Sequence, residues 1–334
     1  MRGGTKQSIA PALALLLLSP VVGELLSGSS PPFEFLNPLA FLFMAGLYGS
    51  GALIIRELAF RWKKGWVSIL IMGAAYGVIE EGLEVKSFFD PAWVDIGALG
   101  SYGRYLGVNW VWSVQLTIYH MVFSIAIPIL LVTLLYQSEK DRAWVTDRAL
   151  KILGAVLLLD VIVGFIWLTP YRPSWLLYWL AMMIVLALFV VAYLVPKQPF
   201  PPNQSNCPRP RRFFLLGLGF ASALFLIAWT SPGWGVPAMV PLSLLLLSCA
   251  LGFHALLKWS GNGSAWGKKH QLALASGALG FLIMLAFPQD IWGPPNMLGM
   301  SLVALAFIVF LVYLWFRVGS DGSIRTPPEF RAQG

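Results

Sequence analysis

Charged residues are scarce in this sequence. They make up 11% of its 334 residues, against about 25% in an average soluble domain. Hydrophobic residues make up 58% and the mean hydropathy is +0.74. Apolar runs long enough to cross a hydrocarbon core of roughly 30 Å recur along almost the whole chain. The composition therefore excludes an ordinary soluble protein and predicts an all-α, polytopic bundle of transmembrane helices, with little chain left for a soluble domain.

Cysteine is almost absent too. The two cysteines are Cys207, in a Pro-rich stretch, and Cys249, in an apolar run. They form no CxxC or Cys/His pattern, so the sequence implies neither a disulfide framework nor a zinc cluster.

Hydropathy predicts about ten membrane-spanning helices when Gly, Pro and charged residues are taken to mark the helix ends. Their ranges are about 8–26, 36–56, 66–88, 109–136, 150–169, 174–195, 213–231, 235–257, 270–288 and 297–316. A short basic region precedes the first helix, as in a cleavable signal peptide. No clear small-x-small cleavage site follows, so we expect this helix to be retained.

The basic residues predict the orientation of the chain. With the N-terminus in the cytoplasm, all but three of the 23 Lys and Arg residues fall on the cytoplasmic side, the exceptions being Lys86, Arg104 and Arg172. This bias predicts a multi-pass protein of the plasma (inner) membrane with both termini cytoplasmic. Topology thus accounts for the net charge of +8, which does not indicate a nucleic-acid partner. The predicted partner is the lipid bilayer.

Composition also divides the chain. We expect residues 1–195 to form an N-terminal group of about six spans, followed by a Pro-rich basic cytoplasmic linker at 196–212, PKQPFPPNQSNCPRPRR. Residues 213–317 then form a four-helix apolar scaffold, and 318–334 form a cytoplasmic tail. Ten spans are also compatible with two groups of five in an inverted repeat of the kind transporters use, although the halves share no residue-level similarity.

Ionisable side chains are concentrated in the N-terminal half of the membrane region. Each such residue costs roughly 2.5 to 3.5 kcal/mol at the bilayer centre, so each needs an explanation. The last four helices contain almost none, whereas the first five contain Glu24, Glu80, Glu81, Glu84, Lys86, His120 and Asp160. We therefore expect a polar site in the N-terminal half, opening toward the outer face.

The third helix, with the sequence GAAYGVIEEGLEVK, carries three glutamates. Gly73, Gly77 and Glu81 recur every fourth residue and share one face, and the GxxxG step predicts close approach of another helix that buries Glu81. Glu80 and Glu84 lie on the neighbouring stripe. Three carboxylates on adjoining faces repel one another when ionised, so we expect them to share a proton or a cation.

A polar stripe marks the fourth helix, and its members are Asn109, Ser113, Thr117, His120 and Ser124. A stripe of this kind normally faces a helix bundle, a ligand or a water-filled cavity. His120 falls near mid-membrane, as does Asp160 in the fifth helix, which has no charged neighbour in its own turn. We expect Asp160 to pair with His120.

The predicted outer side has few basic residues. We expect Lys86 to pair with Asp90, and both to reach water together with Glu84. The sizeable outer loop FFDPAWVDIGALGSYGRYLG contains Arg104. Two roles for this arginine stay open, an ion pair with the glutamates of the third helix and a clamp on an anionic group.

The order of these residues resembles the CAAX-protease and bacteriocin-processing family of intramembrane metal-dependent peptidases. Glu80 and Glu81 match that family's paired glutamates, His120 matches its first histidine, and Asp160 stands in the place of its last acidic residue. The resemblance covers about residues 66 to 165 and implies a site in which glutamate and histidine hold a metal or an activated water.

The chain departs from the family pattern at several positions. Val85 stands where the pattern has arginine, Leu116 replaces the phenylalanine before His120, and Val156 replaces the second histidine. One glutamate and one histidine are fewer than the three protein ligands that a catalytic zinc usually takes.

Three hypotheses use the polar residues. In the first, the site binds a small solute or a cation for transport, a role that tolerates missing metal ligands. Its candidate binding residues are Glu80, Glu84, Ser113, Thr117 and Arg104. In the second, the network is structural and the protein has a partner-binding or assembly role.

The third hypothesis is an intramembrane metal-dependent hydrolase that acts on a membrane-embedded substrate. Glu81 is then the general base, His120 and Glu80 are metal ligands or an oxyanion partner, and Asp160 orients His120. Glu80, Glu81 and His120 are the candidate ligands of a divalent metal, a cofactor expected only under this hypothesis.

Overall fold

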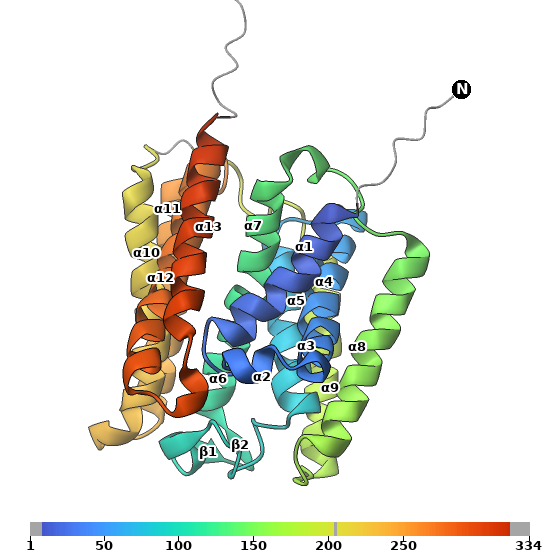
Figure 1. Cartoon of the computed structure of the whole chain (residues 1–334), viewed down its shortest axis with the longest axis vertical. Coiled ribbons are helices and arrows are strands. Elements are labelled where there is room, and N and C mark those ends of the chain that lie inside the picture. The colour runs from blue at the N-terminus through green and yellow to red at the C-terminus, as the bar shows by residue number, and fades with distance from the viewer. Residues whose placement is uncertain (1–8, 204–205, 321–334) are drawn as a thin grey trace, which may run out of the picture.

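The structure is an all-α bundle of membrane-spanning helices (Figure 1). The computed structural model describes residues 9–203 and 206–320. Nine helices in the described residues are long and apolar enough to cross a membrane, and the apolar helix Ala10–Leu25 is shorter. These findings confirm the predicted fold class. The nine long helices and the shorter one together agree with the prediction of about ten.

The bounds of the elements follow the predicted spans closely. The α-helices are α1 Ala10–Pro20, α2 Pro32–Phe35, α3 Pro38–Met44, α4 Ser50–Arg61, α5 Trp66–Val78, α6 Trp110–Tyr119, α7 Ile127–Leu135, α8 Asp147–Trp167, α9 Trp175–Leu194, α10 Pro210–Thr230, α11 Met239–Ser260, α12 Lys268–Trp292 and α13 Met300–Ser320. Four π-helical segments extend or join them: Val21–Leu25, Ala45–Gly49, Ile79–Glu84 and His120–Ala126. The short strands β1 Arg104–Tyr105 and β2 Val108–Asn109 pair antiparallel.

The helices fall into two groups joined by one central rod. Helices α10 to α13 pack on one another, and α1, α3, α4, α5, α8 and α9 form the other group (Figure 1). The rod from α6 to α7 contacts both groups. Within α8 the single buried residue is Gly164, and within α9 only Ala181 and Ala192 are buried. The apolar side chains of these two helices therefore face lipid along most of their length.

Helix α1 begins and α13 ends at the same end of the bundle, and the hairpin of β1 and β2 lies at the opposite end (Figure 1). Two described chain ends on one side agree with an even number of crossings. The side that faces the cytoplasm is still predicted from the basic residues.

Two predicted helix ends need correction. The second span continues to Arg61, because Arg56 and Glu57 are buried in protein and pair with each other at 2.5 Å. A charged pair that is satisfied inside the bundle does not end a helix, although hydropathy alone suggests that it does. The third span ends at Glu84, and Lys86 adopts a φ of 64°, which a continuing right-handed helix cannot use.

Candidate functional site

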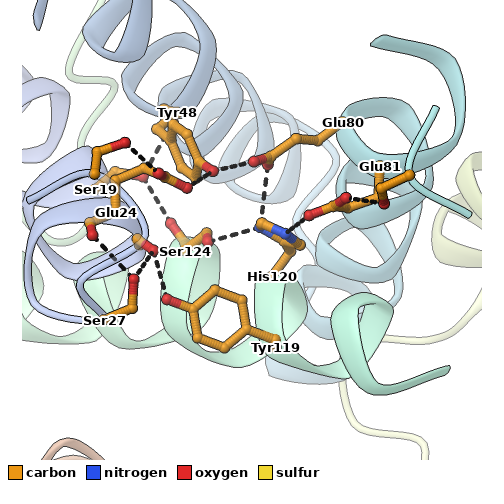
Figure 2. Close-up of polar contacts among 12 residues, drawn as sticks. Ser19, Glu24, Ser27, Tyr48, Glu80, Glu81, Tyr119, His120 and Ser124 are labelled. Carbon is orange, nitrogen blue, oxygen red and sulfur yellow. Dashed lines mark hydrogen bonds and ion pairs between the residues drawn. The ribbon is translucent and has the colours of Figure 1, made fainter. Parts of the chain in front are cut away.

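The polar residues of the N-terminal half converge at the four π-helical segments. These segments carry Glu24, Tyr48, the glutamates Glu80, Glu81 and Glu84, and the pair His120 and Ser124. A π-helical turn is rare, and inside an α-helix it frequently marks a functional site because it redirects side chains and frees backbone groups. All four π-helical segments in the described residues thus contribute to one polar core (Figure 2).

His120 lies at the centre of this core, between two glutamates (Figure 2). Its Nε2 atom is 2.9 Å from Glu81 Oε1, and its Nδ1 atom is 3.0 Å from Glu80 Oε2. Nδ1 is also 3.0 Å from Ser124 Oγ. The exposed fractions are 2% for His120, 4% for Glu80 and 8% for Glu81, so the three side chains are screened from bulk water and lipid.

A tyrosine links a further carboxylate to this centre. The hydroxyl of Tyr48 contacts the carboxylates of both Glu24 and Glu80, and Ser30 Oγ donates to Glu24 Oε2 at 2.7 Å. A phenol has one proton to donate. It can satisfy only one of the two carboxylates as a donor, so the other needs a proton or a cation of its own.

Hydroxyl groups hold the π-helical segments together. Ser19 Oγ lies 3.0 Å from the carbonyl oxygen of Tyr48 and 2.7 Å from that of Ser124. Tyr119 donates to the carbonyl oxygen of Gly23 at 2.5 Å. Backbone carbonyls without their usual helical partner must be satisfied in another way inside a membrane. These contacts meet that need and fix the distances between the segments.

Glycine permits the close approach of the elements that hold the site. A Cβ atom on Gly77 would lie 3.1 Å from the Cα atom of Thr117 and 3.2 Å from the Cβ atom of His120. On Gly23 it would lie 2.8 Å from the Tyr48 ring. The predicted close approach at Gly77 and the burial of Glu81 are therefore confirmed.

The second oxygen of Glu81 has its own support. Ser87 Oγ donates to Glu81 Oε2, and Trp112 Nε1 donates to Ser87 Oγ at 2.9 Å. Ser87 is fully buried and Trp112 is 6% exposed. The carboxylate of Glu81 is thus held at both oxygens, by His120 on one side and by Ser87 on the other.

Two further carboxyl groups lie beside the core. Glu84 is fully buried, and neither of its carboxylate oxygens has a hydrogen-bond partner among the described residues. Its side chain occupies the space left by the absent Cβ of Gly164 on α8. One turn earlier on α8, the Oδ2 atom of Asp160 lies against Gly46, also without a partner in the described part of the chain. The pairing of Asp160 with His120 expected from the sequence is therefore not formed.

The basic residues predicted on the outer side, Lys86, Arg104 and Arg172, bind backbone carbonyls and have no described ion pair with a carboxylate. Lys86 and Asp90 are buried, and Lys86 Nζ donates to the carbonyl oxygens of Phe165 at 2.6 Å and Thr169 at 3.2 Å. Burial lowers the pKa of Lys86 to about 8. The expected pair with Asp90 and the expected exposure to water are both wrong, because the two side chains pack against the end of α8 and the turn after it, where Thr169 Oγ1 donates to Asp90 Oδ2 at 3.0 Å.

Arg104 also lies away from the core. It donates to the carbonyl oxygens of Phe89 at 2.7 Å and Gly100 at 3.2 Å, and burial lowers its pKa. These bonds brace the loop that contains Arg104, so the ion pair with the glutamates of the third helix, one of the two roles that the sequence left open, is not formed.

The remaining predicted binding residues support the helix that carries His120. Ser113 Oγ donates to the carbonyl oxygen of Asn109 at 2.6 Å, while the Asn109 side chain accepts from Trp112 N and caps α6. Thr117 provides backbone against Gly77. None of these three side chains has a described bond to the glutamates.

Sequence reasoning placed Glu24 among the costly residues but not in the site, and it did not identify Tyr48. A tyrosine within an apolar run gives no periodic signal. The available signal was the free-energy cost of placing Glu24 in the membrane, because this cost required a partner for Glu24 on another helix.

The core offers a compact set of metal-binding atoms. One ligand atom each from Glu80, Glu81 and His120 lies within 4.8 Å of the other two, which is compatible with one ion between them. Three protein ligands of oxygen and nitrogen type leave a further position open for water or substrate. With Glu24, three carboxylates face one imidazole, so the core needs protons or a cation for neutrality.

The comparisons with known proteins agree with this membrane architecture. A family model described as an uncharacterized membrane protein family matches residues 13–320. No curated protein and no solved structure matches the chain. Because the family model covers nearly the whole chain, the protein belongs to this uncharacterized membrane protein family.

Proposed function

We propose that the protein binds a divalent metal ion inside the membrane, between Glu80, Glu81 and His120, and exchanges it for protons in cation transport. The observation that carries this proposal is the convergence of all four described π-helical segments on these three side chains and their carboxylate partner Glu24. Rare backbone geometry repeated at one point favours a binding role over a purely structural network.

The donor set favours a class of ion. A mixture of imidazole nitrogen and carboxylate oxygen suits Zn²⁺, Mn²⁺, Fe²⁺ or Co²⁺, whereas Ca²⁺ and Mg²⁺ prefer sites made of oxygen alone. Ser124 at Nδ1 of His120 and Ser87 at Oε2 of Glu81 supply the outer hydrogen bonds that orient metal ligands. The site thus resembles a transition-metal site both in its ligand atoms and in the hydrogen bonds that orient them.

Protons and metal compete for the same atoms. Ligand nitrogen must be unprotonated and ligand carboxylates must be ionised, so binding of the metal releases protons. Without the metal, an imidazolium at position 120 would place its positive charge 3.0 Å from Glu80 Oε2 and 2.9 Å from Glu81 Oε1. Each state neutralises part of the buried negative charge, which is the basis for coupled exchange.

The first experiment measures bound divalent metal in protein purified in mild detergent. We expect near-stoichiometric metal in the wild type and strong loss in Glu81→Gln and His120→Ala. Glu84→Gln is the matched control, because Glu84 is a buried glutamate of the same π-helical segment outside the set of ligand atoms. Metal that persists in Glu81→Gln, or that never appears in the wild type, contradicts the proposal.

Transport is tested separately in proteoliposomes. We expect uptake of the bound metal to be driven by an outwardly directed proton gradient and to be abolished by His120→Ala. Stoichiometric binding without uptake leaves the metal site intact as a proposal and removes the transport role.

A metal-dependent hydrolase is the second candidate. Two observations favour it: the partial resemblance of Glu80, Glu81 and His120 to the CAAX-protease pattern, and the position that three protein ligands leave open for a water. Deep burial of the ligands counts against it, because a substrate must reach the metal. Metal-dependent cleavage of a membrane-embedded peptide by the wild type, lost in Glu81→Gln, decides for this candidate.

A further inference from the structure

An apolar groove runs between α10, α12 and α13, outside the polar core. It consists of two adjoining hollows of about 420 and 360 Å³ that share Phe214, Ser276 and Trp315 in their walls. On α12 the groove is lined by Ala273, Ser276 and Gly280, whose spacing places them on one face. Because these side chains are small, the neighbouring helices leave an open trough between them.

One end of the groove is basic. Arg209 and Arg211 line it, and both are exposed. Lys269 Nζ lies 5.3 Å from the centre of the Trp315 ring in the groove wall. Helices α10 and α12 begin, and α13 ends, at this same end of the bundle (Figure 1). The basic end therefore lies at a membrane surface, which the positive-inside rule predicts to be cytoplasmic.

No described carboxylate neutralises this basic end. The single acidic residue between positions 201 and 320 is Asp290, which accepts from the backbone N–H groups of Gly299 and Ser301 at 2.9 Å. It stands 21 residues after Lys269 on the same helix, a separation of about 30 Å. Within residues 206–320, no carboxylate therefore competes with an external anion for the arginines at the mouth of the groove.

The length of the groove matches one leaflet. Its lining on α12 extends from Ala273 to Met284, which corresponds to about 16 Å of helix rise. Half of a hydrocarbon core of roughly 30 Å is similar. A basic mouth at the membrane surface and an apolar trough of leaflet depth fit one class of molecule.

We propose that this groove binds a phospholipid with an anionic headgroup. Arg209 and Arg211, with Lys269 beside them, hold the headgroup phosphate, and an acyl chain lies along the groove. Arginine forks match phosphate geometry, and basic pockets between transmembrane helices bind anionic lipid headgroups. Orientation of the chain alone accounts for basic residues at this surface, but it does not require a trough that begins at them.

The test is native mass spectrometry of the full-length protein in detergent, titrated with dioleoyl phosphatidylglycerol or dioleoyl phosphatidylcholine. We expect phosphatidylglycerol to bind more tightly, and Arg209→Gln/Arg211→Gln to weaken it roughly 10- to 30-fold. Arg148→Gln/Lys151→Gln is the matched control, because both residues are exposed basic residues on another helix end. This control should bind as the wild type does.

A second variant tests the groove apart from its charges. Gly280 has only ordinary neighbours near its missing Cβ, at 3.7 and 3.8 Å, so Gly280→Leu should fold and fill the trough. We expect this variant to bind phosphatidylglycerol more weakly than the wild type does. Inorganic phosphate should not compete with the lipid for the site. The proposal is overturned if both double variants lose the same affinity for phosphatidylglycerol, or if the two lipids bind equally tightly. Full competition by inorganic phosphate would also overturn it, because the site would then be one for a free anion.

Discussion

Ser87→Ala provides a sharp test of the proposed metal site, because it removes a supporting hydrogen bond without changing any charge. Ser87 Oγ donates to Glu81 Oε2 and accepts from Trp112 Nε1 at 2.9 Å. The variant leaves that oxygen of Glu81 without its described donor and the Trp112 N–H without its described acceptor. Both groups are buried, so bulk water does not easily replace the lost hydroxyl.

The expected magnitude follows from these contacts. Loss of a group that orients a metal ligand typically weakens metal binding about 10- to 100-fold, which corresponds to about 1.4 to 2.8 kcal/mol. The unsatisfied Trp112 N–H should separately lower the free energy of unfolding by about 1 to 3 kcal/mol. The two effects are measured independently, in the folded protein and in its unfolding.

The assay is a competitive titration of Zn²⁺ or Mn²⁺ between the protein and a fluorescent chelator, with unfolding followed by circular dichroism. Ser113→Ala is the matched control, because its hydroxyl donates to Asn109 O within its own helix at 2.6 Å and has no described contact with the glutamates. Unchanged metal affinity in folded Ser87→Ala, or an equal loss in Ser113→Ala, would refute the reasoning.

Four further predictions concern packing and buried charge. Glu57→Ala should lower the free energy of unfolding by about 3 to 5 kcal/mol, because it leaves Arg56 buried without its counterion; a loss below about 1 kcal/mol in denaturant titration contradicts this. Gly77→Val should lower the melting temperature and weaken metal binding together, since a Cβ there already meets the neighbouring backbone at 3.1 Å; a stable variant with wild-type binding argues against close packing at this step. Glu84→Met should raise the melting temperature, because it replaces a buried carboxyl group without a described partner. Gly164→Ala should lower it through overlap with the Glu84 side chain, and Glu84→Ala should relieve that overlap in the double variant; additive effects of the two changes exclude the contact.

The number and type of helices were predictable because hydropathy is a local property. A run of apolar residues has to cross the bilayer as a helix wherever its neighbours lie. The predictions for charged residues were wrong where a tertiary contact lowered the free-energy cost of burying the charge. Arg56 and Glu57 neutralise each other inside the bundle, so the second span continued past them, and Lys86 found carbonyl oxygens of α8 and the following turn instead of water.

The candidate site was predicted in part for the same reason. Glu80, Glu81 and His120 stood out by their cost in the membrane, and the structure brings their ligand atoms within 4.8 Å of one another. Their partners depend on which helices meet. Tyr48 therefore gave no signal, and Asp160 was assigned to His120 although it lies against Gly46.

The sequence by itself determined that this chain crosses the membrane many times, that its basic residues mark one side, and that its costly polar groups lie in the N-terminal half. Each of these properties follows from the transfer of individual side chains between water and lipid. The tertiary structure decided which groups satisfy one another. Four π-helical segments, distant in sequence, turn Glu24, Tyr48, Glu80, Glu81 and His120 toward one point, and α10, α12 and α13 leave a groove beside exposed arginines. Such arrangements depend on contacts between helices, because backbone hydrogen bonds and hydropathy hold each helix in the membrane but do not specify its neighbours.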